Sequence, residues 1–343
     1  MLDALSYDDV LLVPQYSDIK SRAEIDISAD LGNSLTLELP ILSSPMDTIS
    51  ESPMVVAMSK YGGGGIIHRY VSIEKQCRMV QLAHDISPQE TPTVGAAIGT
   101  TEDYMGRAIA LVKTGATFIC VDVAHGHHIL MKEALLNLRK AFGDEFHLMA
   151  GNVATLEGIN DLADWGANSV RCNIGGGSIC STRLQTGHGL PGFQTILDCA
   201  KTDRKVAIIA DGGIRNAGDI VKALAAGADA VMCGSLLAGA NETPGKVIEE
   251  KDGSRWKIYR GMASKEAQIS WRGKYASFEG VSSTVPYRGG VKYILNDLER
   301  GIRSGLSYSG ARSISQLHAR AKFIKQTSSG LSEGHTHIIG RKW

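Results

Sequence analysis

The alternation of short apolar runs with longer amphipathic stretches most limits how this chain can fold. Eight runs rich in β-branched and small apolar residues, each closed by a small or polar cluster, lie at residues 40–46, 64–68, 94–99, 118–124, 147–153, 169–174, 206–210 and 230–236. Stretches with helical spacing separate most of them, among them residues 104–114, 129–142, 156–165 and 217–226. Strands that alternate with helices predict parallel βαβ units.

Eight such units in one chain predict a single (β/α)8 TIM barrel domain over residues 1–343; an open doubly wound sheet is the alternative. The barrel is favoured because candidate ligand residues follow nearly every strand, as a ring of loops at one end requires. Residues 1–37 are expected to form an extended or hairpin segment that closes the bottom or an edge. Residues 238–290 break the pattern and are expected to form a lid or flap, and residues 326–343 a mobile C-terminal tail.

Charge and cysteine content narrow the class of protein. The 36 basic residues balance 36 acidic ones, so no overall field attracts nucleic acid or a membrane surface. No apolar run reaches membrane-spanning length, and the N-terminus has no signal-peptide pattern. The six cysteines form no CxxC pair, which favours a reducing cytoplasmic location over a disulfide-stapled secreted protein.

A glycine-rich loop after the sixth run carries the strongest candidate for a nucleophile. Cys180 lies in the loop 173–183, which has three consecutive glycines, and Thr182 and Arg183 lie two and three residues after it. Glycines let the backbone approach a ligand closely, and a nearby cation or helix N-terminus activates a thiol. The alternative is a packed thiol, since most buried cysteines behave as small hydrophobes. Core packing is what we expect of Cys120, Cys172, Cys199 and Cys233.

The loops after the last two strands predict a phosphate site. In barrels these two loops frequently bind phosphate through backbone N–H groups. The expected cradle consists of Gly212, Gly213, Gly234 and Ser235, together with Ser178 from the cysteine loop. Asp211 would then accept hydrogen bonds from a ribose diol. The alternative is that these glycines only make tight turns.

Other polar residues follow the remaining strands. Asp122 can pair with a cationic or amide-bearing ligand or with Arg171, and Asn152 and Ser44 are expected on the same face. In the lid, Glu279 can bind the amidine edge of a purine or act as acid or base, and the alternative is a solvated loop carboxylate. Three histidines, at 125, 127 and 128, lack the spacing of known metal sites.

Together these residues resemble the inosine-5′-monophosphate dehydrogenase / GMP reductase family. The resemblance extends over nearly the whole chain and is carried by the cysteine loop, by Gly234-Ser235 and by the segments Tyr7-Asp-Asp-Val-Leu-Leu-Val-Pro14, Ser43-Ser-Pro-Met-Asp-Thr48, Ala210-Asp-Gly-Gly213, Tyr259-Arg-Gly-Met262 and Glu279-Gly280. It implies a barrel, usually tetrameric, that binds a purine mononucleotide at the carboxyl ends of the strands. It also implies that Cys180 attacks C2 of the base, where a nicotinamide cofactor exchanges hydride.

The resemblance also implies roles for individual residues. Nucleotide binding would fall to Ser44, Ser178, Asp211, Gly212, Gly213, Gly234, Ser235, Tyr259, Gly261, Met262 and Ala263. The cofactor side would hold Asp122, Val123, Ala124, Asn152 and Arg171. The backbone carbonyls of Gly175, Gly177 and Cys180 would match the K+ site of many members.

The family has two branches. Its dehydrogenases oxidise IMP to XMP with NAD, use an Arg-Tyr pair on a long flap to activate water, and mostly carry a regulatory module between the second and third strands. Its reductases convert GMP to IMP with NADPH and use a threonine and a glutamate to expel ammonia. Here about 20 residues, 72–93, fill the gap where that module would lie, and no adjacent Arg-Tyr pair occurs between Ser264 and Glu279, where Arg272-Gly-Lys-Tyr275 is the nearest approach.

Thr182 and Glu279 are both present, so the expected activity is that of a GMP reductase, with Cys180, Thr182 and Glu279 as catalytic residues. The alternatives are an IMP dehydrogenase without the regulatory module and a non-catalytic purine-nucleotide sensor. Several positions depart from the family pattern. Arg69 replaces an expected lysine, Asn173 an expected glycine, Gly176 an expected proline or other small residue, and Gly192 the glutamine of an expected Pro-Gln.

Overall fold

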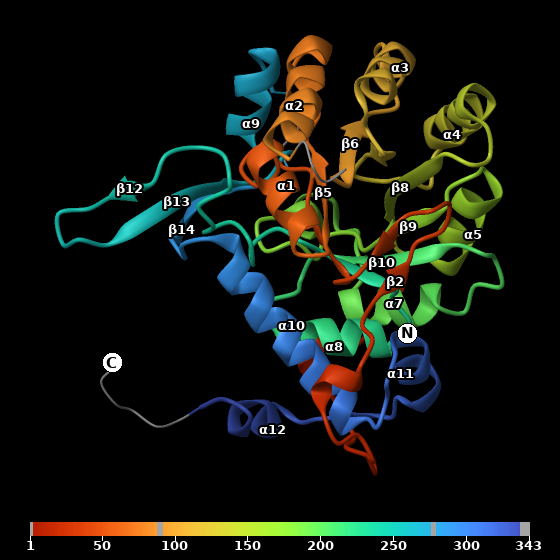
Figure 1. Ribbon diagram of the computed structural model, residues 1–343, viewed down its shortest axis with the longest axis vertical. Helices are drawn as coiled ribbons and strands as arrows, with labels where there is room; N and C mark the ends of the chain where they lie inside the picture. Colours follow the sequence, from red (N-terminus) through yellow and green to blue (C-terminus); the bar gives the residue numbers. More distant parts are fainter. Residues whose placement is uncertain (1–2, 88–91, 276–278, 337–343) are drawn as a thin grey trace.

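Eight parallel strands close into a barrel in the computed structural model, which describes residues 3–87, 92–275 and 279–336 (Figure 1). The strand order around the barrel is β10-β11-β4-β5-β6-β7-β8-β9. The strands are β4 (Ile41–Ser43), β5 (Gly64–Ile67), β6 (Val94–Ile98), β7 (Phe118–Asp122), β8 (His147–Val153), β9 (Ser169–Cys172), β10 (Ala207–Asp211) and β11 (Ala230–Cys233). All eight predicted strands are confirmed, and the open doubly wound alternative is wrong.

One helix follows each strand on the outside of the barrel. These are α1 (Ser52–Lys60), α2 (Ile73–Ile86), α3 (Tyr104–Thr114), α4 (Ile129–Phe142), α5 (Leu156–Asp164), α7 (Gly192–Cys199), α8 (Ala217–Ala225) and α10 (Val291–Tyr308). Side-chain caps explain where several begin: Asp103, Thr155 and Asn216 accept backbone N–H groups in the first turns of α3, α5 and α8. The connection between β5 and β6 contains α2 and no inserted domain.

The barrel strands are apolar because both of their faces are covered. Every residue of β5, β6, β9 and β11 is buried, as parallel strands under helices require. Large and small side chains complement each other inside. A Cβ atom added at Gly95 would lie 2.3 Å from Cζ of Phe118, so the glycine leaves room for the ring on the neighbouring strand.

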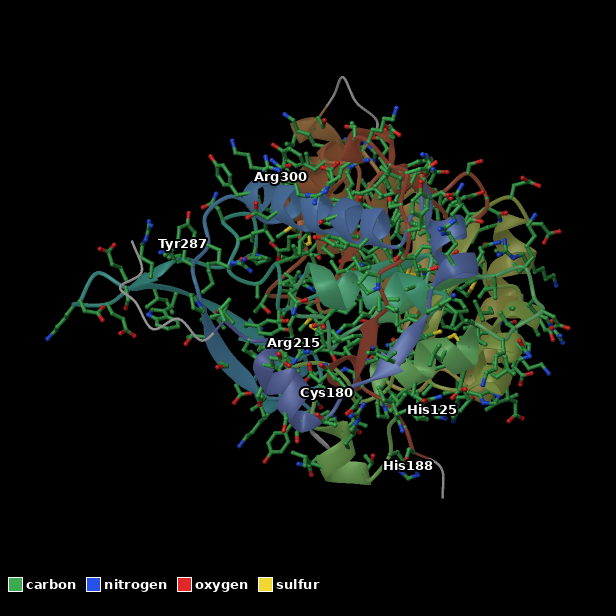
Figure 2. All side chains as sticks on the ribbon, turned by 90° about the horizontal axis from the view of Figure 1, so that it is seen from below. His125, Cys180, His188, Arg215, Tyr287 and Arg300 are labelled. Atoms are coloured by element: carbon green, nitrogen blue, oxygen red, sulfur yellow. The ribbon has the colours of Figure 1, made fainter. Side chains whose placement is uncertain are left out.

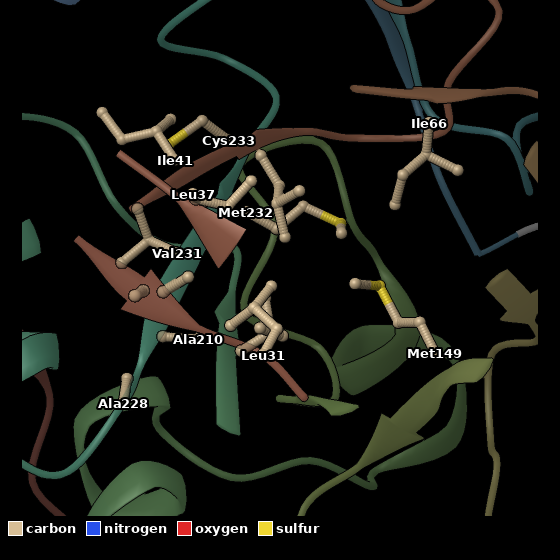
Figure 3. Packing of buried hydrophobic residues seen from close by; sticks show 14 of the residues in the cluster. Leu31, Leu37, Ile41, Ile66, Met149, Ala210, Ala228, Val231, Met232 and Cys233 are labelled. Atoms are coloured by element: carbon tan, nitrogen blue, oxygen red, sulfur yellow. The ribbon is translucent and has the colours of Figure 1, made fainter. Parts of the chain in front are cut away.

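The N-terminal segment covers, through its hairpin, the end of the barrel opposite the carboxyl ends of the strands, while its residues 5–9 lie against the segments that follow β9 and β10. It contains η1 (Tyr7–Asp9), β1 (Val10–Leu12), η2 (Arg22–Glu24) and the hairpin of β2 (Ala29–Asp30) with β3 (Thr36–Leu37). Leu31 and Leu37 pack beside barrel residues such as Val231 (Figure 3). The first residue of β8, His147, contacts Gly32 O of the hairpin at 2.9 Å, which places the hairpin at the amino ends of the strands, as expected.

The segment expected as an irregular lid has regular structure. A three-stranded antiparallel sheet of β12 (Ile248–Glu249), β13 (Arg255–Arg260) and β14 (Ser282–Pro286) extends away from the barrel (Figure 1). The helix α9 (Lys265–Arg272) contacts the segment before α2 through the stacked rings of Trp271 and Tyr70. An ion pair between Arg260 and Asp47 joins the base of this sheet to the loop after β4.

The C-terminal part runs back along the barrel. It comprises α11 (Ile314–Arg320), β15 (Phe323–Lys325) and α12 (Ser328–Glu333), and β15 pairs antiparallel with β1. Of the tail expected to be mobile, residues 337–343 lie outside the described residues. No helix in the described part of the chain combines the length and apolarity that crossing a membrane demands.

Candidate active site

A cavity of about 330 Å³ opens at the carboxyl ends of the barrel strands, where barrel enzymes place their sites. All the residues predicted from sequence for catalysis, nucleotide, cofactor and K+ line it. Sequence reasoning did not assign ten further lining residues: Pro45, Met46, Arg69, Tyr70, Asn173, Ile174, Gly176, Ile179, Ile214 and Met232. Lining the cavity places a residue but does not assign its role.

Three side chains form a hydrogen-bonded chain at the mouth of the cavity. Thr182 Oγ1 donates to Glu279 Oε2 at 2.7 Å, and Cys180 Sγ lies 3.1 Å from Thr182 Oγ1. Because an ionised carboxylate only accepts, the single hydroxyl proton of Thr182 is directed to Glu279. The thiol is therefore the donor in the contact between Cys180 and Thr182, and a proton path leads from sulfur to carboxylate.

Backbone pairing fixes this arrangement although the residues are far apart in sequence. Ser181 N donates to Glu279 O at 2.9 Å, and Val281 N donates to Ile179 O at 3.0 Å. Glu279 N in turn donates to Ala263 O at 3.1 Å. The cysteine loop and the end of the flap thus form a short two-stranded contact that presents Glu279 to Thr182.

The six cysteines differ in how far their side chains are exposed to solvent. Cys180 is exposed, and Cys120, Cys172, Cys199 and Cys233 are buried, as predicted. Burial raises the pKa of the Cys120 and Cys233 thiols to about 12, which keeps them protonated and unreactive. Cys180 is the exposed thiol that lines the cavity (Figure 2).

Arg183 does not take the role that its sequence position suggested. Its guanidinium donates to Leu190 O, and its side chain packs against Gly175 and Gly189. It does not line the cavity. It therefore braces the cysteine loop from below, and the expectation that it activates the thiol is not supported by this geometry.

The expected phosphate cradle consists of backbone from three loops. Gly212 and Gly213 have φ angles of +85° and +78°, a region that side-chain-bearing residues rarely occupy. A Cβ atom on Gly212 would lie 3.3 Å from the backbone of Gly177, so the two loops approach closely. Near them, Ser178 Oγ lies 3.4 Å from Tyr259 OH. Burial raises the pKa of Tyr259, so its hydroxyl stays protonated and available as a donor.

A buried ion-pair network forms the floor of the cavity. Arg171 donates through Nε and Nη2 to Asp211 Oδ2, at 3.0 and 2.8 Å, and through Nη1 to Asp122. Asn152 Nδ2 donates to the same Asp211 oxygen at 2.8 Å. Although burial alone lowers the pKa of Arg171, the two carboxylates raise it well above its ordinary value. The predicted pairing of Asp122 with Arg171 is confirmed, whereas the pairing of Asp211 with Arg171 was not foreseen.

The carbonyls implicated in K+ binding lie on the cysteine loop. Gly177 O accepts the Cys180 N–H at 3.0 Å, and a carbonyl oxygen retains a second lone pair after one such bond. Backbone carbonyls are suitable ligands for K+. The donor chemistry of Gly175, Gly177 and Cys180 therefore fits this ion.

Comparison with known proteins identifies the family. The chain matches the family described as IMP dehydrogenase / GMP reductase domain over residues 4–337. It is 33% identical to an inosine-5′-monophosphate dehydrogenase of Nitrosopumilus maritimus, covering 98% of each chain, and 32% identical to a GMP reductase of Leishmania major, covering 99% of this chain and 98% of the other. The crystal structure of a Trypanosoma brucei GMP reductase variant with guanosine 5′-monophosphate matches with a TM-score of 0.93, 30% identity and 99% coverage of both chains. The chain belongs to the IMP dehydrogenase / GMP reductase family.

Proposed function

We propose that this protein is a GMP reductase that converts GMP to IMP and ammonia with NADPH. Members of the family are oxidoreductases acting on purine nucleotides, and relatives with either activity in their names have similar identity to this chain. The observation that carries the choice is the hydrogen-bonded chain of Cys180, Thr182 and Glu279. A threonine and a glutamate beside the nucleophile suit the expulsion of an amine, which must leave with an added proton.

The flap supports the same choice. The segment of the flap that most resembles the Arg-Tyr pair of the dehydrogenases is Arg272-Gly-Lys-Tyr275. The side chain of Arg272 is directed elsewhere. Its guanidinium pairs with Glu102 at 2.8 Å, lies 3.8 Å from the ring centre of Trp271, and does not line the cavity. None of the arginines in the described part of the flap lines the cavity with Cys180. The hydrolytic step of a dehydrogenase therefore lacks its usual residue.

The geometry supplies a proton route for the reductive reaction. The Cys180 thiol passes its proton through Thr182 to Glu279, and the thiolate forms an S–C bond at C2 of the guanine base. Glu279 returns that proton through Thr182 to the 2-amino group, which leaves as ammonia when the C–N bond breaks. NADPH, when bound, supplies hydride to C2. The S–C bond then breaks, IMP is released, and the thiolate takes up a proton from solvent.

The other residues bind and orient the two ligands. Backbone N–H groups of the glycine loops would hold the nucleotide phosphate, and the second oxygen of Asp211 is available to a ribose hydroxyl. Asp122 and Asn152 would face the cofactor, and Arg171 holds both carboxylates in place. We also propose a K+ ion on the carbonyls of the cysteine loop, a homotetramer and a cytoplasmic location, which rest on the family resemblance.

The decisive experiment compares two substrate pairs with purified protein and K+. Reduced-nicotinamide absorbance is followed with GMP plus NADPH and, separately, with IMP plus NAD, and ammonia is assayed. Loss of absorbance with stoichiometric ammonia from GMP is the expected result. A rise in absorbance with IMP and NAD, without a reaction of GMP, would replace the proposal with the dehydrogenase activity. Nucleotide binding without either reaction would favour a purine sensor.

A further inference from the structure

Arg69, which follows β5, lines the cavity with its hydrogen-bond donors unused. Among the described residues its Nε is buried and has no hydrogen-bond partner. Asp122 Oδ2 is the carboxylate oxygen that pairs with it, 3.9 Å from Nε, which is too far for a hydrogen bond. Arg171, the other cation lining the cavity, already donates to Asp122 and Asp211. Of the two cations among the described lining residues, Arg69 is thus the one whose guanidinium makes no hydrogen bond to a carboxylate, so its N–H groups are available to a ligand.

Contacts other than hydrogen bonds hold the guanidinium of Arg69 in place. Its central carbon lies 5.4 Å from the ring centre of Tyr70 and 5.6 Å from that of Trp271. The two rings stack on each other with centres 4.2 Å apart and an interplanar angle of 16°. A Cβ atom on Gly99 would lie 3.3 Å from Arg69 Nη1, so the absence of a side chain there leaves room for the group. The guanidinium is therefore positioned before any ligand binds, which lowers the entropy cost of binding.

The charges around the cavity indicate what Arg69 binds. Its lining carries three carboxylates, those of Asp122, Asp211 and Glu279, and Arg171 is committed to the first two. A nicotinamide dinucleotide brings a pyrophosphate with two negative charges, which needs a cation on this side of the cavity. A guanidinium presents paired N–H groups that match phosphate oxygens.

We propose that Arg69 anchors the pyrophosphate of the nicotinamide dinucleotide, next to a ribose hydroxyl bound by Asp122. This inference rests on the proposed use of a nicotinamide cofactor and assigns it a specific anion contact. Arg69 acts here through the shape and charge of its guanidinium and takes no part in proton transfer. Its contribution is a fixed charge and a fixed hydrogen-bond geometry.

The test measures equilibrium binding without turnover. In a Cys180→Ala background saturated with GMP, the dissociation constant of NADPH is determined by calorimetry for Arg69, Arg69→Lys and Arg69→Gln proteins. Arg69→Gln is expected to weaken NADPH binding by about 10- to 100-fold, the loss typical of a charge-assisted contact. Arg69→Lys keeps the positive charge but lacks the paired N–H groups of a guanidinium, so its dissociation constant for NADPH should lie between those of the Arg69 and Arg69→Gln proteins. Binding of GMP alone should be unchanged.

Arg272→Gln is the matched control, because Arg272 also contacts the Trp271 ring but pairs with the exposed Glu102 outside the cavity. It should leave NADPH binding unchanged. Unchanged NADPH affinity in Arg69→Gln would overturn the proposal, as would a loss of GMP affinity in its place or an equal loss in the Arg272→Gln control. If turnover assays show that the enzyme oxidises IMP with NAD, the same titration with IMP and NAD tests Arg69 independently of that outcome.

Discussion

Thr182 Oγ1 and Glu279 Oε2 lie 2.7 Å apart although 97 residues separate them in the chain. The threonine begins the short helix α6 (Thr182–Thr186) and the glutamate ends the flap, so the barrel scaffold and the flap together create the contact. Because its hydroxyl donates to Glu279, Thr182 can only accept a hydrogen bond from the thiol of Cys180, and so connects the thiol to the carboxylate. The proposed activity depends on that link more than on any other contact in the cavity.

Replacing Glu279 by glutamine should slow turnover of GMP by about 10² to 10⁴-fold, the usual contribution of a general acid or base. The amide keeps the hydrogen bond to Thr182 but cannot store the thiol proton. Steady-state kinetics and GMP binding by calorimetry measure the effect, and binding should persist. Glu266→Gln is the control, because Glu266 lies on the exposed face of α9 and contacts Ser282. Equal rates for Glu279→Gln and wild type would remove Glu279 from the mechanism.

Replacing Cys180 by alanine should abolish turnover and leave GMP binding intact, since no other thiol is exposed among the described cysteines. Cys77→Ala, a partly buried thiol on α2, serves as the control and should retain activity. Mass spectrometry of the acid-quenched reaction should detect a nucleotide adduct on the wild-type protein and none on Cys180→Ala. Residual turnover in Cys180→Ala would contradict covalent catalysis.

The sequence was sufficient to predict the barrel because each strand is buried on both faces and each helix has a periodic apolar face. These patterns are local, and they placed β8, α3 and α4 to the residue. The polar lining residues that directly follow strands, such as Asp122, Asn152 and Asp211, were also predictable, because the carboxyl ends of all barrel strands face one shared mouth. The flap residues came from the family resemblance, and ten lining residues were not assigned.

Pairings within the cavity were less accessible from sequence. Asp211 was expected to bind a ribose, but it shares Arg171 with Asp122. The guanidinium reaches both because β9 pairs with β10 on one side and lies one strand away from β7 on the other. Arg183 follows the nucleophile in sequence yet turns beneath the loop to Leu190 O. The stacking of Tyr70 on Trp271 joins segments 201 residues apart, and no periodic pattern in the sequence indicates it.

Arg171→Leu should lower the free energy of unfolding by about 3–5 kcal/mol, because it removes a buried cation and leaves two partly buried carboxylates without it. Urea denaturation monitored by circular dichroism measures this change. Arg204→Leu is a suitable comparison: Arg204 also pairs with two aspartates, Asp164 and Asp203, but at the surface. Its removal should leave the unfolding midpoint near that of wild type, since exposed ion pairs stabilise little. Similar losses in both variants would contradict the role assigned to the buried network.

His147 should make the protein less stable in mild acid. Because Gly32 O can only accept, Nδ1 of His147 donates to it at 2.9 Å, and Nε2 accepts from Ser169 Oγ at 2.8 Å. Burial lowers the pKa of His147 to about 4, against an ordinary value near 6.5, while the bond to Gly32 acts in the opposite direction. Both folded and unfolded states are neutral at this position above pH 6.5. Between pH 6.5 and 4 only the unfolded state takes up the proton. The free energy of unfolding therefore falls by about 3 kcal/mol in total as the pH is lowered through this range.

Urea denaturation between pH 8 and pH 4.5 tests this expectation against two variants. His147→Gln should be less stable than wild type at pH 8, because it loses a fitted contact between the barrel and the hairpin. Its stability should nevertheless decline less steeply below pH 6.5, because the buried titrating group is gone. His188→Gln removes an exposed histidine that follows α6 and should keep the wild-type slope (Figure 2). Parallel slopes for wild type and His147→Gln would show that His147 titrates alike in both states and that burial does not hold it neutral.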